Sequence, residues 1–132
     1  MTQPVVPRVF PDVQRLLVEA LTVWVGEDNT DTETPEDLQE RLPFIRVERI
    51  GGGRGVVSDR PTVEVQVYAA TYAQAQSLSE RICEWLCGPP PPIPQLDKVT
   101  CDGGPREIPY GDIRIRRFVT SYQLTTRRVP AA

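Results

Sequence analysis

The side chains that could carry chemistry in this sequence are three cysteines, a cluster of carboxylates and a glycine-rich stretch. Cys83 and Cys87 are one helical turn apart and Cys101 falls in a predicted strand, so a structural zinc site would need a fourth ligand. Because the chain has no histidine, that ligand would be a carboxylate such as Asp102, which is uncommon in such sites. We therefore expect the cysteines to pack in the core as thiols, and we predict no metal and no cofactor.

The absence of histidine also limits catalysis. No other side chain has an unperturbed pKa near neutrality, so Ser-His-Asp and Cys-His nucleophiles are excluded. The seven carboxylates within residues 26–42 lack the spaced Asp, Asn and Gly of a calcium loop. We predict no catalytic residue and a protein that is not an enzyme; an α+β enzyme that uses Asp or Glu as acid and base is the alternative.

The stretch GGGRG, which comprises Gly51, Gly52, Gly53, Arg54 and Gly55, raises the question of phosphate binding. A Walker A loop ends in Lys followed by Ser or Thr and leads into a helix, and the dinucleotide-binding motif also needs a helix directly after its glycines. Here the glycines lead through VVSDRP into a predicted strand, with no lysine nearby. We therefore expect a flexible hairpin tip that contacts other molecules, with its arginine exposed.

Charge is unevenly distributed along the chain, although the net charge is only −3. Residues 26–42 contain seven acids and one base, whereas residues 106–128 contain six arginines and two acids. Patches of opposite sign favour subunits that meet head to side, since attraction of this kind sets register and encounter rate. The alternative is that both segments are solvated faces whose charges contribute little.

Arg114, Arg116 and Arg117 alternate with apolar residues, which predicts a basic stripe on a sheet face or in the lumen of a ring. Fourteen of the fifteen basic residues are arginine, which favours planar pairing with carboxylate or phosphate. DNA passing nearby is compatible with this stripe, but no aromatic platform or recognition helix indicates a reader of DNA sequence. We favour a pairing surface for acidic neighbours over a nucleic-acid-binding module.

Two amphipathic helices are expected. Residues 13–24 carry an apolar stripe at helical spacing, and Gly26 follows the end of that stripe. A second helix opens at Thr71, where Gln74 completes a capping box, and it ends before the proline run at residues 89–92.

The segments between these helices and beyond them complete the expected order of elements. The acidic residues 26–42 are predicted to be a mobile connection, too polar to enter the core, and residues 88–96 a stiff Pro-rich crossing. In the last strand the apolar residues fall on odd positions up to Ile115 and mostly on even positions from Phe118. This change predicts a β-bulge, with one extra residue near Arg116; the alternative is that the strand leaves the sheet there to contact a neighbouring subunit. The four expected strands are residues 44–50, 62–70, 98–101 and 112–128.

The order helix, strand, strand, helix, strand, strand indicates an α+β fold. Only one face of strand 62–70 is fully apolar, so we predict a two-layer sandwich: a mainly antiparallel four-stranded sheet with two helices packed on one face. At this length we expect a single domain over residues 1–132. The sequence has no apolar run of about 18 residues and no secretion signal, so we expect no membrane contact and synthesis in the cytoplasm.

The chain resembles the tail terminator proteins of long-tailed bacteriophages, of the small minor tail or head-tail joining type found in phages of actinobacteria. The resemblance spans almost the whole chain. It is carried by the amphipathic first helix followed, in this order, by LPFIRVERIGGG, RPTVEVQVYAATYAQAQSLSERI and IRIRRFVTSYQLTTR. The long acidic segment and the four consecutive prolines depart from the family pattern.

The resemblance implies a structural protein of the virion tail or neck, assembled in the host cytoplasm, that forms a homo-hexameric ring. Such a ring caps the tube made by the tail tube protein, ends its polymerisation and offers a docking surface to the head-tail connector, with genomic DNA near its lumen. The alternative within virion assembly is another neck or head-completion component. The candidate axial contacts are Gly51, Gly52, Gly53, Arg54, Gly55, Arg106 and Tyr110, and the candidate subunit or lumen contacts are Arg114, Arg116 and Arg117.

Overall fold

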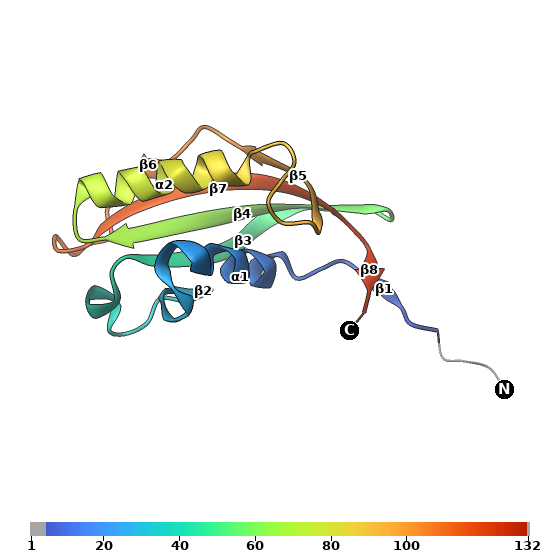
Figure 1. The fold of residues 1–132 in the computed structure, drawn as a ribbon, viewed down its shortest axis with the longest axis horizontal. Coiled ribbons are helices and arrows are strands. Elements are labelled where there is room, and N and C mark those ends of the chain that lie inside the picture. The colour runs from blue at the N-terminus through green and yellow to red at the C-terminus, as the bar shows by residue number, and fades with distance from the viewer. Residues whose placement is uncertain (1–4, 132) are drawn as a thin grey trace.

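The structure of the chain is a computed structural model that describes residues 5–131, and it forms a sheet with two α-helices over one of its faces (Figure 1). The α-helices are α1 (Val13–Val25) and α2 (Tyr72–Leu86). Two short 3-10 helices lie in the chain between α1 and β3: η1 (Glu27–Asn29) before β2 and η2 (Leu38–Arg41) after it. The strands are β1 (Arg8–Val9), β2 (Thr30–Asp31), β3 (Phe44–Arg54), β4 (Ser58–Ala69), β5 (Leu96–Cys101), β6 (Arg106–Glu107), β7 (Arg116–Arg127) and β8 (Val129–Pro130).

The main sheet has six strands in the order β2-β3-β4-β7-β5, with β6 beside β7. All of its pairs are antiparallel except β2 with β3, which is parallel. The predicted α+β class and antiparallel sheet are confirmed, and the four expected strands correspond to β3, β4, β5 and β7. The structure adds the short strands β2 and β6 and a separate pair formed by β1 and β8, because two-residue strands leave no recognisable alternation in a sequence.

Both helices begin at the capping residues expected from the sequence. The Asp12 carboxylate accepts a hydrogen bond from the Arg15 amide at 3.2 Å, and the Thr71 hydroxyl accepts one from the Gln74 amide at 3.2 Å. Each cap satisfies an amide that the first helical turn leaves without a partner.

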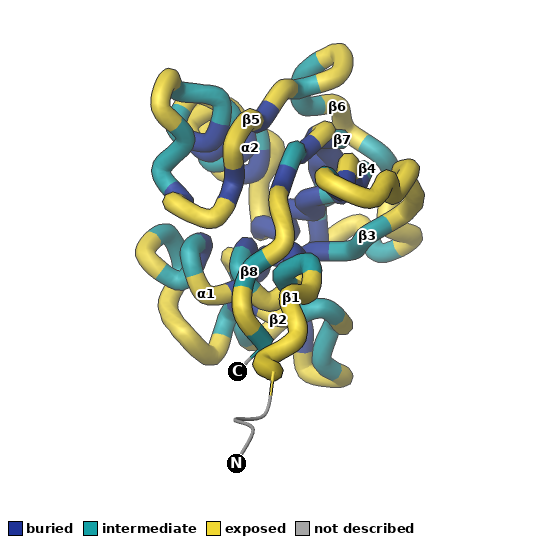
Figure 2. The backbone as a smooth tube through the Cα atoms, turned by 90° about the vertical axis from the view of Figure 1, so that its right-hand side faces the viewer, coloured by how far each residue is buried: buried dark blue, intermediate teal, exposed yellow. Residues whose placement is uncertain are grey.

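The main core lies between the two helices and one face of the sheet (Figure 2). Alternate residues of β4 point into it, so strand periodicity places the valines of that strand in one layer. The helices close the core with their apolar stripes. Its fully buried members include Leu17, Leu21, Ile45, Val47, Val63, Val67, Ile82, Leu86, Tyr122 and Leu124.

A second apolar cluster lies on the opposite face of the sheet, at the end where β3 begins. Phe44 and Tyr68 are paired across β3 and β4 and alternate in register with the residues that face the helices. Leu38 of η2 and Ile115 cover them, and all four side chains are buried. The prediction that the acidic segment is too polar to enter the core is therefore wrong at Leu38; the mobility predicted for residues 26–42 stays a prediction.

The β-bulge predicted near Arg116 is also wrong. Strand β7 begins at Arg116, and its register with β4 runs without a shift from there to Arg127. The change of parity has another cause: Ile115 packs in the second cluster, whereas Phe118 lies on the helix-covered face. The apolar residues change face because both faces of this end of the sheet are covered.

Two other segments were predicted from the sequence. The Pro-rich crossing at residues 88–96 leads from α2 to β5, and Ile93 within it is buried in the main core. Among residues 5–131, no helix combines the length and the apolar character that a membrane crossing requires.

The hairpin of β3 and β4 projects beyond the helices at one end of the molecule (Figure 1). Strand β3 continues through Arg54, so Gly51, Gly52 and Gly53 lie within the strand and not at the expected tip; the tip is Gly55 to Val57, which confirms the expectation for Gly55 alone among the glycines. An extra residue, Ile50, shifts the register of the arm. Gly52 has a φ of +109°, and a Cβ atom there would lie 2.1 Å from the Arg60 carbonyl oxygen. Only glycine fits this position.

We expect Gly52→Ala to lower the free energy of unfolding by about 1–3 kcal/mol, because the methyl group enforces a strained backbone and displaces the paired strand. Gly53→Ala is the matched control, since nothing lies within 4 Å of a Cβ at Gly53 and its φ is ordinary. Urea unfolding of the two variants measures the difference. Equal stability of the variants would contradict the role assigned to Gly52.

Candidate assembly surfaces

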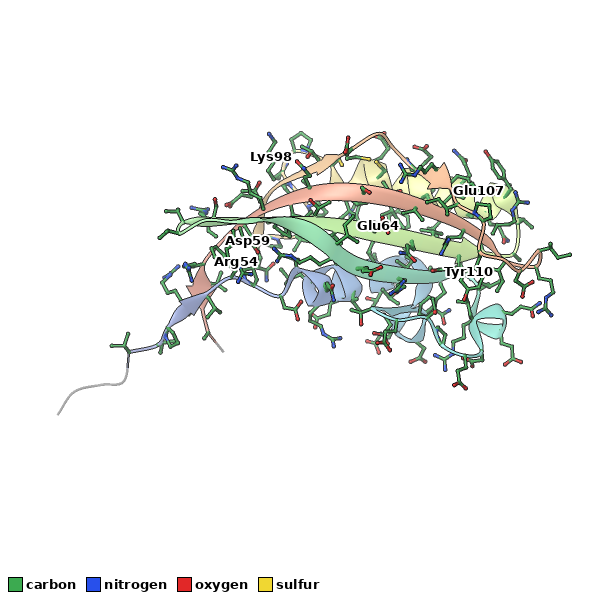
Figure 3. The ribbon with its side chains drawn as sticks, turned by 180° about the vertical axis from the view of Figure 1, so that it is seen from behind. Arg54, Asp59, Glu64, Lys98, Glu107 and Tyr110 are labelled. Carbon is green, nitrogen blue, oxygen red and sulfur yellow. The ribbon has the colours of Figure 1, made fainter. Side chains whose placement is uncertain are left out.

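Two surfaces at opposite ends of the sheet contain the residues that the sequence singled out (Figure 3). The hairpin end contains Arg54 and Asp59, and the loop end contains Tyr110 and the loop that precedes β7. Glu64 lies between them on the sheet face that the helices leave open. The predicted axial contacts therefore do not form one patch: the glycines and Arg54 lie at the hairpin end, and Tyr110 lies at the loop end.

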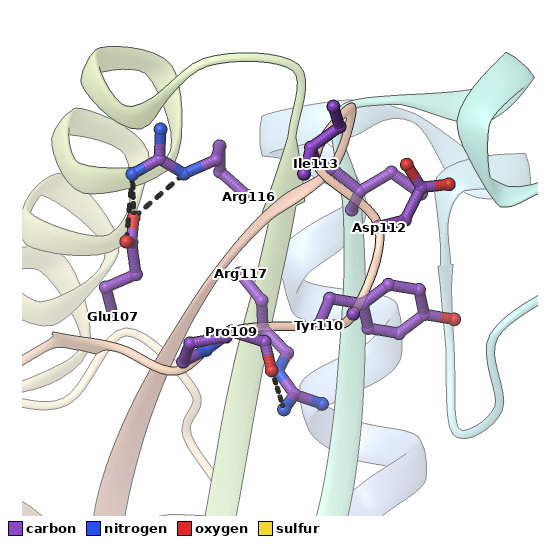
Figure 4. Close-up of a pocket in the computed structure, with 9 residues that line it drawn as sticks. Glu107, Pro109, Tyr110, Asp112, Ile113, Arg116 and Arg117 are labelled. Atoms are coloured by element: carbon purple, nitrogen blue, oxygen red, sulfur yellow. Dashed lines mark hydrogen bonds and ion pairs between the residues drawn. The ribbon is translucent and has the colours of Figure 1, made fainter.

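Two of the three arginines that were predicted to contact another subunit or the lumen make ion pairs with carboxylates at the loop end. The Arg114 guanidinium donates to both carboxylate oxygens of Asp112, with its shortest contact at 2.9 Å. Arg116 donates to both oxygens of Glu107 on β6 at 2.8–3.2 Å (Figure 4). The hydrogen bonds from Arg114 hold the pKa of Asp112 below its ordinary value. Arg114 thus binds a carboxylate within the loop, and Arg116 connects the start of β7 to β6 on the other side of the loop.

The third arginine, Arg117, binds the backbone of the loop. Its guanidinium donates to the carbonyl oxygens of Ile108 at 3.2 Å and Pro109 at 3.0 Å, and it lies 5.5 Å from the centre of the Tyr110 ring (Figure 4). Tyr110 in turn meets Tyr68 edge to face, with ring centres 5.2 Å apart. Contacts of the three arginines with another subunit or the lumen stay a prediction, and the structure adds this intramolecular role.

The loop encloses an open pocket of about 350 Å³. Its wall is partly apolar, formed by Pro109, Tyr110 and Ile115, and the Ile113 side chain at its edge is 97% exposed. Arg106 lies outside this wall, on β6, and is exposed. A single isoleucine exposed to this extent beside an apolar pocket is a candidate contact with another protein.

The acidic segment lies directly beside this loop. Residues 35–40 and residues Tyr110, Asp112, Arg114 and Ile115 line one hollow of about 290 Å³. The prediction of two separate patches of opposite charge is therefore wrong for Arg114, which lies beside the acids of its own chain. The two segments are far apart in the sequence, which suggested that their charges would lie apart in the fold. They are neighbours because Leu38 of η2 packs against Tyr68 and brings the acidic segment next to the loop.

A buried charge anchors the hairpin close to its tip. The Asp59 side chain is fully buried, and its carboxylate accepts hydrogen bonds from Arg49 at 2.9 and 3.0 Å and from Arg54 at 3.2 Å. Burial alone would raise the pKa of Asp59, but the hydrogen bonds and positive charges of the two arginines outweigh it, so the pKa lies below its ordinary value. Sequence reasoning missed this site, although Asp59 has the parity of the buried valines of β4, which is unusual for a charge.

The two ends of the chain meet the hairpin at the same place. Phe10 lies between two guanidinium groups, 4.7 Å from that of Arg54 and 4.3 Å from that of Arg128. Arg128 also donates to the Val56 carbonyl oxygen at 2.9 Å, and β1 pairs with β8. These contacts connect the N-terminal segment, the C-terminal segment and the hairpin tip.

The three cysteines pack at the edge of the main core, as the sequence predicted. Burial, with the nearby thiols of Cys83 and Cys101, raises the pKa of Cys87 to about 12. Burial, with the nearby Cys83 thiol, raises the pKa of Cys101 to about 11. Thiols with such pKa values stay protonated at neutral pH and are poor nucleophiles. Within the described part of the chain, no three His, Cys, Asp or Glu residues are arranged to hold a metal ion.

The family of the chain follows from comparison with known proteins. The sequence model of a family described as phage tail termination protein matches residues 9–91, which run from β1 through the hairpin to the end of α2 and the first prolines. The chain belongs to the phage tail termination protein family. A search of the curated proteins finds no match. The tail terminator identity inferred from sequence is thus confirmed.

Membership of the tail termination family places this protein in the tail of a phage virion. The family is described by the ending of a tail and not by a chemical reaction, in agreement with a structural role. The match includes the whole hairpin and the acidic segment, whereas the loop before β7 lies beyond it.

We expect Asp59→Asn to lower the free energy of unfolding by about 3 kcal/mol at pH 7, because it leaves two guanidinium groups without their buried partner. The folded pKa of Asp59 is lowered, so its stabilisation is present above the ordinary pKa of Asp and is lost as the pH falls through the folded value. The difference between wild type and variant should therefore shrink below about pH 4. Urea unfolding from pH 7 to pH 3 measures it.

Asp97→Asn is the control for this experiment. Asp97 also accepts two hydrogen bonds from an arginine, Arg127, but both side chains are partly exposed. Its replacement should cost less than about 1 kcal/mol at pH 7. A cost for Asp59→Asn as small as that of the control would refute the anchoring role.

Arg117→Ala should lower the free energy of unfolding by about 1–2 kcal/mol, because it leaves two loop carbonyls and the Tyr110 ring without their partner. It should also speed hydrogen exchange at the Ile108 amide, which donates to the Arg117 carbonyl oxygen at 3.0 Å. Arg114→Ala is the comparison and should have a smaller effect, since Arg114 is itself exposed and its side chain binds, among residues 5–131, only the nearby Asp112. Equal exchange rates in the two variants would contradict this assignment.

Proposed function

We propose that this tail termination protein closes into a homo-hexameric ring on the end of the completed tail tube. One face of the ring binds the last layer of the tail tube protein and stops further addition. The other face receives the head-tail connector of the filled head. The protein acts through the shape and charge of its surfaces, is assembled into the virion in the host cytoplasm, and catalyses no reaction in this role.

The observation that supports this proposal is the pair of exposed apolar ends. Val56 and Val57 at the hairpin tip are 83% and 72% exposed, and Ile113 at the opposite end is almost fully exposed. Large apolar side chains that project from both ends of a small domain are typical of surfaces that other proteins cover. A subunit with different contact surfaces at its two ends makes heterologous contacts, which close into a ring when the rotation between copies allows it.

Termination then requires only two unlike ring faces. A face that matches the tube end binds it, while the opposite face must present a surface that another tube subunit does not fit. The contacts with another subunit or with the lumen are assigned to Arg114, Arg116 and Arg117. In the lumen their guanidinium groups would also be compatible with the phosphates of passing DNA. Arg106 retains its proposed axial contact.

Particles produced without this protein test the proposal by negative-stain electron microscopy. We expect tails of irregular and excessive length that carry no heads, because nothing stops tube growth or receives the connector. Expression of the wild-type chain in trans should restore tails of one length joined to heads. Normal joined tails in its absence would exclude the proposed function.

A further inference from the structure

The folded subunit has a basic end and an acidic end. Six arginines gather around the hairpin tip and the terminal segments beside it, and the acids there are already paired, since Asp59 binds Arg49 and Arg54 and Asp97 binds Arg127. Arg60 on the outer side of the arm is exposed and makes no ion pair with any described residue. The six arginines are Arg8, Arg49, Arg54, Arg60, Arg127 and Arg128.

The hollow beside the loop forms the acidic end. Within it Asp37 is paired with Arg41, and Asp112 is paired with Arg114. Glu36 and Glu40 line the same hollow, are exposed, and form no ion pair within residues 5–131. The hollow thus presents carboxylates that can still accept a guanidinium group.

Apolar surface accompanies the charge at both ends. The tip presents Val56 and Val57, and the pocket next to the acidic hollow presents Tyr110 and Ile113. The pocket and the hollow share Tyr110, Asp112 and Ile115 in their linings, so they adjoin each other, and together they form a groove beside the loop. Arginines also line this groove, but Arg114 and Arg116 are paired with carboxylates and Arg117 binds backbone carbonyls. A valine tip flanked by arginine therefore matches a groove that offers apolar side chains and unpaired carboxylates.

We propose that the hairpin tip of one copy inserts into this groove of the next copy, with Val56 and Val57 against Tyr110 and Ile113 and Arg60 near Glu36 and Glu40. The inference rests on the proposed ring and names the contact that closes it. It assigns the tip and Tyr110 to a contact between subunits in place of the axial contact expected from the sequence.

The contacts within the hairpin favour such insertion. The hairpin is held in one geometry by the ion pairs of the buried Asp59 carboxylate, by the contacts of the Phe10 ring with two guanidinium groups and by the required glycine at position 52. Arg128 binds the Val56 carbonyl oxygen and so fixes the tip itself. A contact made by an already ordered arm loses less conformational entropy on association than one made by a mobile loop.

Disulfide formation between two differently tagged chains tests the contact directly. One chain carries Val57→Cys, the other carries Ile113→Cys, and both are co-expressed so that tails incorporate a mixture. After mild oxidation, mass spectrometry should find a disulfide that joins the two introduced cysteines and so links the two tags. Both positions are exposed in the subunit, so neither substitution removes a core side chain.

The matched control replaces Val57→Cys by Val23→Cys, an equally exposed position on α1. We expect the tip-to-loop link to be at least about tenfold more abundant than the control link, because proximity raises the effective concentration of the two thiols. If tails are capped and joined to heads but the two disulfides are equally rare, this contact is refuted and the proposed ring is not. If tails contain no copy of the protein, both the contact and the proposed ring are refuted.

A disulfide from the cysteine introduced at the tip to the tube protein would instead support the axial contact expected from the sequence.

Charge reversal provides a second, independent readout. Arg60→Glu should reduce incorporation into tails, and the difference from wild type should shrink with added salt, because salt screens both the attraction in the wild type and the repulsion in the variant. Glu40→Arg in the same chain should restore incorporation, since every copy contributes both surfaces. Arg15→Glu, the same change on exposed α1, should have no effect. Failure of the double variant to exceed the single variant would count against the pairing of these ends.

Discussion

The buried carboxylate of Asp59 is the interaction on which the projecting hairpin depends. The hairpin extends beyond the helices, so the main core does not cover it, although β7 stays paired with β4 as far as Ser58. Here two arginines from the facing strand share one carboxylate close to the tip of the hairpin, and one of them also stacks on Phe10. The arm is thus held by charge and aromatic contacts where burial is insufficient.

The opposite end of the subunit is held differently. There the sheet is covered on both faces, by α2 on one side and by the cluster of Leu38, Phe44, Tyr68 and Ile115 on the other. The loop before β7 lies on this second cluster and is tied down by Arg117. This well-packed end of the sheet, with the exposed Ile113 at its edge, is suited to bind another protein subunit.

A family defined by tail termination needs surfaces more than reactive groups, and the distribution of charge in this subunit fits that requirement. The thiols of Cys87 and Cys101 are kept protonated by burial, and the carboxylates with a lowered pKa, Asp59 and Asp112, are bound by arginine in ion pairs. Arginine is used almost everywhere a base occurs, because its planar group can bind a carboxylate, a backbone carbonyl or an aromatic ring. The same side chains that order one subunit therefore define the surfaces offered to the next.

The sequence by itself determined the two helices and their caps, the long antiparallel strands, the α+β class and the tail terminator family, because periodicity and capping are local properties of the chain. Only the tertiary structure decided what lies on the far face of the sheet and which charges are neighbours. Leu38 and Ile115 are far apart in sequence, as are Arg114 and the acids of residues 35–40, and no local pattern indicates that they meet. The alternation of β4 places Asp59 on the same face as the buried valines, and this can be read from the sequence. Its arginine partners cannot, because they depend on the bulge at Ile50 and on the register of β3 with β4 in the folded sheet.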